Sequence, residues 1–175
     1  GNESLECLLR VLMGEDPKYH VEPNQYNKHG KAVGHLIGGN LSILYSLSGT
    51  DADISPLGKI LFIEDLDEYL YHIDRMLMNL KHCGKLKSIA GLIVGGLTEM
   101  KDNHIPFGFA PHEIVANVMK EYDIPICFDF PAGHVEPNLS LIMGRRVHLE
   151  VNANGAAVTF EKPAIVKSFD SQEEP

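Results

Sequence analysis

Cysteine is scarce in this sequence of 175 residues, and long hydrophobic runs and an excess of positive charge are missing. Cys7, Cys83 and Cys127 are odd in number and far apart, which argues against a disulfide framework and against a zinc knuckle. Such cysteine usage favours a reducing compartment, so we expect a cytoplasmic protein. The start at Gly1 has neither a methionine nor the basic-then-apolar layout of a signal peptide, and we expect it to be a cut end.

Hydropathy and charge also exclude two classes of partner. The apolar runs, such as 92–94, are far shorter than the roughly 20 residues that cross a bilayer, so no membrane-spanning segment is expected. The formal net charge of -9 disfavours a nucleic-acid or anionic-membrane partner, because phosphate binding depends on clustered lysine and arginine. What is present is a chain that is 44% hydrophobic and long enough to bury a globular core.

Composition divides the chain into three parts. A short amphipathic helix is followed by a polar stretch, 15–30, whose two prolines and lack of periodicity predict an irregular connection. We expect 1–30 to be a junction, 31–166 to be the folded domain and 167–175 to be a tail, with residues 171–175 disordered.

Helical and strand periodicities alternate through the middle of the sequence. Ser4 is the expected N-cap of the first helix and Asn40 that of the second, while Pro111 suits the first turn of a later one. Strands separated by helices are most simply parallel, with right-handed crossovers. The expected strands are 32–37, 59–63, 88–94 and 124–128, followed by a hairpin of 146–151 and 156–160 with Asn-Gly in its turn, and the expected helices are 4–13, 41–48, 68–82 and one from 111 onward.

Ionisable residues follow two of these strands. In a parallel sheet, the loops after the strands emerge at one edge, and ligands bind there. Glu64, Gly95-Gly96 and Gly133-His134 fall in three such loops, so Glu64 and His134 are expected on one rim although they are far apart in sequence. These two residues could be two members of a hydrolytic triad.

Each of the two residues also has a simpler interpretation, which stays open at this point. Glu64 could cap or salt-bridge the helix that begins near residue 68, although Asp65 and Asp67 suit that capping role better by type and position. His134 is one of nine histidines, and most histidines are surface or structural residues. The prolines on either side of His134 restrict the loop backbone, as the presentation of a fixed base requires.

The sequence has no clear motif for a nucleophile or for a metal site. It has no G-x-S-x-G turn, and the three serines of 42–48 fall within or at the end of a predicted helix. Cys127 is the best internal alternative, but its apolar neighbours predict a buried, inert thiol. The sequence has no H-E-x-x-H or C-x-x-C pair, and His134 with Glu136 is only a weak hint of metal ligands, so no metal or cofactor is expected.

Four stretches, in order and spacing, resemble the LD-carboxypeptidase family of serine peptidases, which includes the microcin-immunity peptidases. The resemblance covers roughly residues 30–160 and corresponds to the family's C-terminal domain. The sequence departs from the family pattern at His72, where arginine is common, and at 141–144, where a Leu-Pro-x-Gly stretch is common. The matching stretches are Gly38-Gly39-Asn40-Leu41-Ser42, Gly58-Lys59-Ile60-Leu61-Phe62-Ile63-Glu64-Asp65, Tyr71-His72-Ile73-Asp74-Arg75-Met76-Leu77 and Gly133-His134-Val135-Glu136-Pro137-Asn138.

The resemblance implies a fold and a division of catalytic labour. The implied fold is α/β: a swivelling β/β/α domain whose mixed, mainly parallel sheet is flanked by helices and extended by the C-terminal hairpin. In the family, the nucleophilic serine lies in an N-terminal domain, and the C-terminal domain supplies a glutamate and a histidine, which match Glu64 and His134. On this basis, 31–166 is the catalytic half-domain, and 1–30 is the junction toward a missing N-terminal domain that carries the serine.

The resemblance also implies an activity and an assembly. The complete enzyme would cleave an amide bond to a terminal D-amino acid in murein-type peptides, and it would be a homodimer without a cofactor. This chain alone is then expected to be inactive, because it lacks the nucleophile. The alternative is a non-catalytic binding or assembly domain of the same fold, and a third option is a metal-dependent hydrolase that uses His134 and Glu136.

Overall fold

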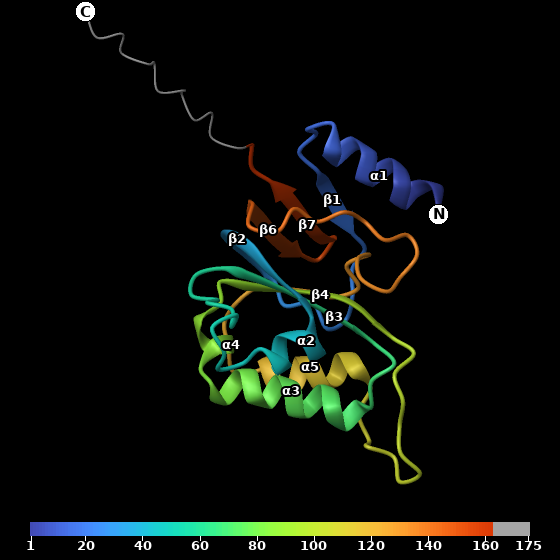
Figure 1. Cartoon of the computed structure of the whole chain (residues 1–175), viewed down its shortest axis with the longest axis vertical. Coiled ribbons are helices and arrows are strands. Elements are labelled where there is room, and N and C mark those ends of the chain that lie inside the picture. The colour runs from blue at the N-terminus through green and yellow to red at the C-terminus, as the bar shows by residue number, and fades with distance from the viewer. Residues whose placement is uncertain (163–175) are drawn as a thin grey trace, which may run out of the picture.

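The computed structural model of the chain describes residues 1–162. The predicted tail, 167–175, the disorder predicted for 171–175 and the last four residues of the predicted folded domain, 163–166, lie outside that range. Within the described range, the chain forms a mixed α/β structure around one seven-stranded sheet (Figure 1).

The sheet has a parallel half and an antiparallel half, which share the long strand β2. The strand order is β1-β7-β6-β2-β3-β4-β5, so β2 to β5 run in parallel and β6, β7 and β1 extend the sheet in the antiparallel sense. The predicted parallel core and the predicted hairpin are both confirmed. The strands are β1 (Lys18–Val21), β2 (Gly30–Asn40), β3 (Ile60–Leu66), β4 (Gly91–Thr98), β5 (Ile126–Cys127), β6 (Arg146–Asn152) and β7 (Gly155–Phe160).

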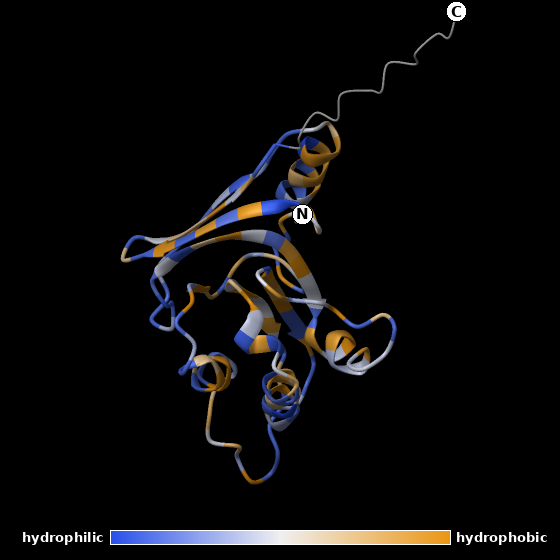
Figure 2. Cartoon of the chain, turned by 90° about the vertical axis from the view of Figure 1, so that its left-hand side faces the viewer, coloured by the Kyte–Doolittle hydropathy of each residue, from blue (hydrophilic) through white to orange (hydrophobic). Residues whose placement is uncertain are grey.

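Two hydrophobic cores lie on opposite faces of the parallel strands, because successive strand residues point to opposite sides. Leu61 and Ile63 pack against the helical layer, whereas Ile60 and Phe62 pack against the antiparallel strands and the segment that follows β5. The layers are therefore β, β and α, with α3 and α5 on one side and the β6–β7 hairpin on the other (Figures 1 and 2). The helices are α1 (Asn2–Leu12), α2 (Leu41–Ser46), α3 (Leu70–His82), α4 (Lys85–Ser88) and α5 (Pro111–Met119).

Two of the predicted helix starts are confirmed and one is wrong. Asn40 is the N-cap of α2, and its side-chain oxygen accepts a hydrogen bond from the Ile43 N–H. Pro111 occupies the first turn of α5. Ser4 is not an N-cap, because α1 already begins at Asn2 and the Ser4 hydroxyl bonds to a distant loop instead.

The irregular connection predicted for 15–30 is also wrong in part, because it contains β1. This edge strand pairs with β7, and of its four residues only Val21 is fully buried. A four-residue strand with so little apolar content gives almost no period-2 signal, so its pairing depends on tertiary contacts.

Glu64 and Gly95-Gly96 lie inside strands, not in the loops that were predicted for them. β3 continues to Leu66, and Glu64 is in register with Asn40 of β2. The prediction failed because a charged residue normally marks the end of an apolar strand. Here the buried carboxylate has a polar partner within reach.

Candidate active site

Glu64 and His134 form a hydrogen-bonded pair at the carboxyl edge of the parallel strands. The Nδ1 atom of His134 lies 2.7 Å from Oε2 of Glu64. The Glu64 side chain is only 7% exposed, whereas the His134 side chain is 51% exposed. The predicted convergence of the two residues on one rim is therefore what the structure shows, with the carboxylate inside and the imidazole facing outward.

The protonation pattern of the imidazole follows from this contact. An ionised carboxylate can only accept hydrogen bonds, so Nδ1 carries the proton that Glu64 binds. The other ring nitrogen, Nε2, is then left with a free lone pair in the neutral ring. The described part of the chain gives Nε2 no hydrogen-bond partner. A base held in this way can take a proton from a group that approaches from outside.

The loop that carries His134 passes directly over Glu64. Gly133 has φ +103°, and a Cβ atom placed there would lie 2.7 Å from Oε2 of Glu64. Both the backbone conformation and the close approach require glycine at this position. Two hydrogen bonds hold the loop on either side, from the Gly133 N–H to Oδ1 of Asn138 at 3.1 Å and from the Thr98 hydroxyl to the His134 carbonyl at 3.1 Å.

Asp65 caps a helix, but not the helix that follows it in sequence. Its buried carboxylate accepts hydrogen bonds from the Asn40 amide and from both the N–H and the hydroxyl of Ser42, at 2.8 to 2.9 Å. These donors belong to the start of α2. The prediction of a cap for the next helix is wrong because Asp65, adjacent to Glu64 in β3, points to the opposite face of the sheet, where α2 begins.

Asp67 does not cap α3 either. The first N–H of α3, that of Leu70, donates to the Lys101 carbonyl, so a neighbouring segment satisfies it. Asp67 instead forms an ion pair of 2.6 Å with the Lys101 ammonium. The cap position itself is Tyr69, which makes no side-chain hydrogen bond to the helix.

A second polar cluster joins the first turns of α2 and α3. Glu68 accepts from the Ser42 hydroxyl at 2.9 Å and lies 2.8 Å from Nδ1 of His72, which lowers the pKa of the Glu68 carboxyl below its ordinary value. A cleft of about 240 Å³ opens beside this cluster. The Ser42 hydroxyl already has two carboxylate acceptors, and it does not hydrogen-bond to His134.

No nucleophile from the described residues meets the imidazole. Cys127, the best internal alternative by sequence, is fully buried in β5, and burial raises the pKa of its thiol to about 12. Its predicted inertness fits these surroundings. Within residues 1–162, no serine, threonine or cysteine side chain hydrogen-bonds to the ring of His134.

Glu136 is directed away from a shared metal site with His134. Its carboxylate accepts a hydrogen bond from the hydroxyl of Ser4 in α1 at 3.2 Å. Among the described residues, no group of three or more potential ligand side chains could hold a metal ion.

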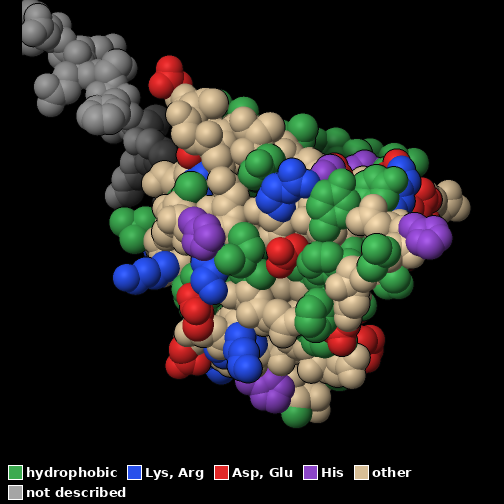
Figure 3. Space-filling model, turned by 90° about the horizontal axis from the view of Figure 1, so that it is seen from below, with side chains coloured by type: hydrophobic (Ala, Val, Ile, Leu, Met, Phe, Trp, Pro, Cys, Tyr) green, Lys and Arg blue, Asp and Glu red, His purple; other side chains and the backbone are tan. Residues whose placement is uncertain are grey.

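The face that carries α3 and α5 has charges of both signs. Figure 3 views the molecule from the side of α3 and α5, and on this face basic and acidic side chains are interspersed among hydrophobic ones. Positive charge does not gather there as nucleic-acid binding requires. None of the helices within residues 1–162 has both the length and the apolar content of a membrane span.

Sequence reasoning did not find the groups that hold the His134 loop. Thr98, Asn138 and Ser4 come from three different segments, and of these Asn138 belongs to a matching family stretch, Ser4 was predicted in another role and Thr98 had no sequence signal. The one available signal was its spacing from Gly133, which suits a side chain that closes a short loop.

Comparison with known proteins identifies the family of this chain. A model of the LD-carboxypeptidase C-terminal domain matches residues 33–149. A probable murein peptide carboxypeptidase of Bacillus subtilis is 38% identical over 147 residues, which is 82% of this chain and 42% of that protein. The murein tetrapeptide carboxypeptidase of Pseudomonas aeruginosa is 27% identical over 150 residues, which is 85% of this chain and 48% of that protein.

A solved structure shows the same fold. The crystal structure of a muramoyltetrapeptide carboxypeptidase from Oxalobacter formigenes has a TM-score of 0.79 and 27% sequence identity, covering 91% of this chain and 55% of that one. The fold and the rim define an α/β domain that presents an imidazole held by a buried carboxylate. The chain belongs to the LD-carboxypeptidase family and corresponds to its C-terminal domain. It spans less than half the length of the two relatives named above.

Proposed function

We propose that this chain is the acid-base half of a serine-type LD-carboxypeptidase. In this proposal His134 takes the proton from a serine hydroxyl and later gives it to the leaving amine, while Glu64 orients the imidazole and stabilises its charged form. The observation that carries the proposal is the 2.7 Å contact between Nδ1 and the buried carboxylate, which leaves Nε2 at the surface.

The nucleophile is proposed to come from a serine-bearing partner domain. Support comes from the absence of a candidate beside His134 within residues 1–162 and from relatives more than twice as long as the matched segment. The apolar face of α1 would suit such a partner. Leu5, Leu8, Leu9 and Leu12 are all exposed, and α1 starts beside the His134 loop. We propose that the partner packs on this face.

The substrate is proposed to be a murein-type peptide with a terminal D-amino acid. The support is the substrate that the printed names of relatives give for those proteins, among them the Bacillus subtilis and Pseudomonas aeruginosa enzymes. Hydrolysis of the terminal amide bond would need the partner's serine and oxyanion donors together with the Glu64–His134 pair.

The test compares the chain alone with the chain joined to the N-terminal half of the Bacillus subtilis relative. Release of the terminal D-amino acid from a murein tetrapeptide is measured by chiral chromatography. We expect no release by the 175-residue chain and measurable turnover by the joined protein. Turnover by the chain alone would show that it needs no outside nucleophile and would contradict the proposal.

The same assay separates the other two functions. A joined protein that folds cooperatively and binds the tetrapeptide without cleaving it would favour the binding or assembly domain. Activity that exhaustive chelation abolishes would favour the metal-dependent hydrolase. We expect chelation to leave the activity of the joined protein unchanged.

A further inference from the structure

The loop that carries His134 is tied to Asn138 and, through it, to α1. We propose that Asn138 is a positioning residue for His134, and that Ser4 of α1 anchors Asn138. This inference rests on the proposed role of the Glu64–His134 pair, and it concerns what holds the pair together.

The conformation of Gly133 decides whether the imidazole reaches the carboxylate. Its backbone lies so close to Glu64 that even the Cβ and Cγ atoms of Glu64 would be 2.8 Å from an added methyl group. Glycine makes this approach possible, but it does not enforce it, because glycine is also the residue with the greatest backbone freedom. Another group must therefore select the conformation with φ +103°.

Thr98 holds the His134 carbonyl on one side of the loop, and Asn138 is the side chain that bonds Gly133 itself. Its Oδ1 atom accepts the hydrogen bond from the Gly133 N–H at 3.1 Å, so its side chain spans the loop that contains His134. The Gly133 N–H and the His134 ring belong to adjacent residues, and rotation about Gly133 moves the ring directly. The hydrogen bond to Asn138 closes the loop around His134 and therefore restricts the directions from which Nδ1 can meet Glu64.

Asn138 is in turn held by the first helix. Its own N–H donates to the Ser4 hydroxyl oxygen at 2.8 Å, and Ser4 donates to Glu136 at 3.2 Å. Two residues further on, the Ser140 N–H lies 3.3 Å from the Cys7 sulfur, so α1 holds this segment at more than one point.

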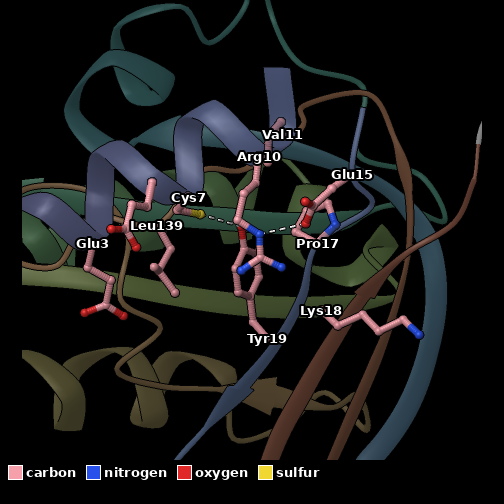
Figure 4. Close-up of a pocket in the computed structure, with 10 residues that line it drawn as sticks. Glu3, Cys7, Arg10, Val11, Glu15, Pro17, Lys18, Tyr19 and Leu139 are labelled. Atoms are coloured by element: carbon pink, nitrogen blue, oxygen red, sulfur yellow. Dashed lines mark hydrogen bonds and ion pairs between the residues drawn. The ribbon is translucent and has the colours of Figure 1, made fainter. Parts of the chain in front are cut away.

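Figure 4 shows the inner side of the same junction. A hollow of about 230 Å³ lies between α1, β1 and Leu139. Tyr19 of β1 approaches the Cys7 sulfur at 3.2 Å and donates to the Ser140 carbonyl at 2.6 Å. These contacts connect α1 and β1 to the end of the loop. They hold in place the backbone segment that follows Asn138.

The test measures which ring nitrogen of His134 carries the proton. Ring ¹⁵N shifts of histidine-labelled chain are recorded at about pH 9, where imidazole side chains are neutral. His134→Gln identifies the signals, and the urea-denatured chain gives the unconstrained ratio of the two tautomers. In the native chain we expect the Nδ1–H tautomer to predominate, and Glu64→Ala to return the ratio toward the unconstrained value.

Asn138→Ala is expected to lower the ratio of the Nδ1–H tautomer to the Nε2–H tautomer by about threefold to tenfold. This factor corresponds to the net free energy that one hydrogen bond contributes. Asn138→Asp keeps an oxygen acceptor for the Gly133 N–H and should retain the native ratio. Ser4→Ala should lower the ratio by a smaller factor. Asn103→Ala, which removes an exposed asparagine of the β4–α5 loop, is the matched control and should leave the ratio unchanged.

A role in loop stability alone would move the unfolding midpoint without changing the tautomer ratio of the folded chain. An unchanged ratio in Asn138→Ala would overturn the inference, and so would equal losses in Asn138→Ala and Asn138→Asp. These results leave the Glu64–His134 pair intact if Glu64→Ala still changes the ratio. If the native chain shows no preference that depends on Glu64, the pair itself is absent, and the proposed function fails together with the inference.

Discussion

At the scale of single residues, the site depends on a carboxylate whose burial in the sheet would be unfavourable without a hydrogen-bond partner. Glu64 lies inside β3 and is nearly fully buried, and its hydrogen bond to His134 compensates for the lost contact with water. Gly133 makes that compensation possible, because any side chain there would meet Glu64. The neighbouring acid, Asp65, is equally buried but serves the start of α2.

Gly133→Ala tests the close approach over Glu64. The new methyl group would collide with the carboxylate and would also strain the backbone, so the substitution should reduce the free energy of unfolding. Gly144→Ala is the matched control, because Gly144 has φ +77° and open space around its Cβ position. We expect Gly144→Ala to cost about 1–2 kcal/mol from backbone strain and Gly133→Ala to cost about 1–3 kcal/mol more from the collision. Equal costs in urea unfolding would show that the contact with Glu64 is absent.

Asp65→Ala tests the cap on α2. The substitution removes the buried carboxylate that accepts from the partly buried Asn40 amide and Ser42 N–H, so unfolding should become easier by about 1–3 kcal/mol. Asp123→Ala removes an exposed carboxylate that lies 3.8 Å from Lys28, and it should change the stability by no more than about 0.5 kcal/mol. Urea unfolding measures both variants. A small effect at Asp65 would contradict the capping role.

The Glu68 cluster predicts a pH dependence of stability. His72 and Ser42 lower the pKa of the Glu68 carboxyl in the folded chain relative to the unfolded chain. The contribution of the ionised Glu68 carboxylate to the free energy of unfolding is therefore fully present above the ordinary glutamate pKa of about 4.3. It is lost as the pH falls through the lowered pKa of Glu68 in the folded chain. Between about pH 5 and pH 3, Glu68→Gln should lose less stability than the native chain does. Glu99→Gln, at an exposed position, should follow the native curve, and identical curves for all three proteins would exclude the effect.

At the scale of secondary-structure elements, α1 differs from the other helices. None of its residues is buried, and its leucines face outward, whereas α3 buries five side chains against the sheet. α1 therefore contributes little to the core of the described chain, and its contacts with the His134 loop are polar.

Leucine truncations in the two helices test this difference. Leu77→Ala in α3 removes a side chain that is fully buried and should cost about 2–5 kcal/mol. Leu12→Ala in α1 removes a side chain that is 70% exposed and should change stability by no more than about 0.5 kcal/mol. Urea unfolding of the isolated chain gives both values. A large cost at Leu12 would show that the outer face of α1 is already covered within this chain.

Elements with strong periodicity could be predicted from the sequence, and weak ones could not. The alternating apolar strands and the capped helices α2 and α5 have local signals that agree with the final fold. β1 is too short and polar to give such a signal, and its place in the sheet depends on β7. The rim position of Glu64 and His134 followed from parallel topology, but the crossing of Gly133 over Glu64 depends on tertiary geometry that no local pattern encodes.

At the scale of the whole molecule, the described chain has a seven-stranded sheet, two hydrophobic cores and the Glu64–His134 pair, which we propose is part of a hydrolytic site. The family and the fold are those of the LD-carboxypeptidase C-terminal domain, whose relatives named above extend well beyond the matched segment. The division into a junction before residue 31 and a domain after it stays a prediction, as does the homodimer, which analytical ultracentrifugation of the joined protein would check. Within residues 1–162 no nucleophile contacts His134, so the proposed function requires that His134 acts as a base toward a group from outside this range.

The role of His134 as the base is tested by the rate at which the joined protein, with and without His134→Gln, releases the terminal D-amino acid from a murein tetrapeptide. Both proteins must first show the same cooperative unfolding, so that a loss of activity is not a loss of fold. We expect His134→Gln to lower kcat by about 10⁴-fold and Asn103→Ala to leave kcat unchanged. A folded His134→Gln protein that keeps its kcat within about tenfold of the native value would contradict the account.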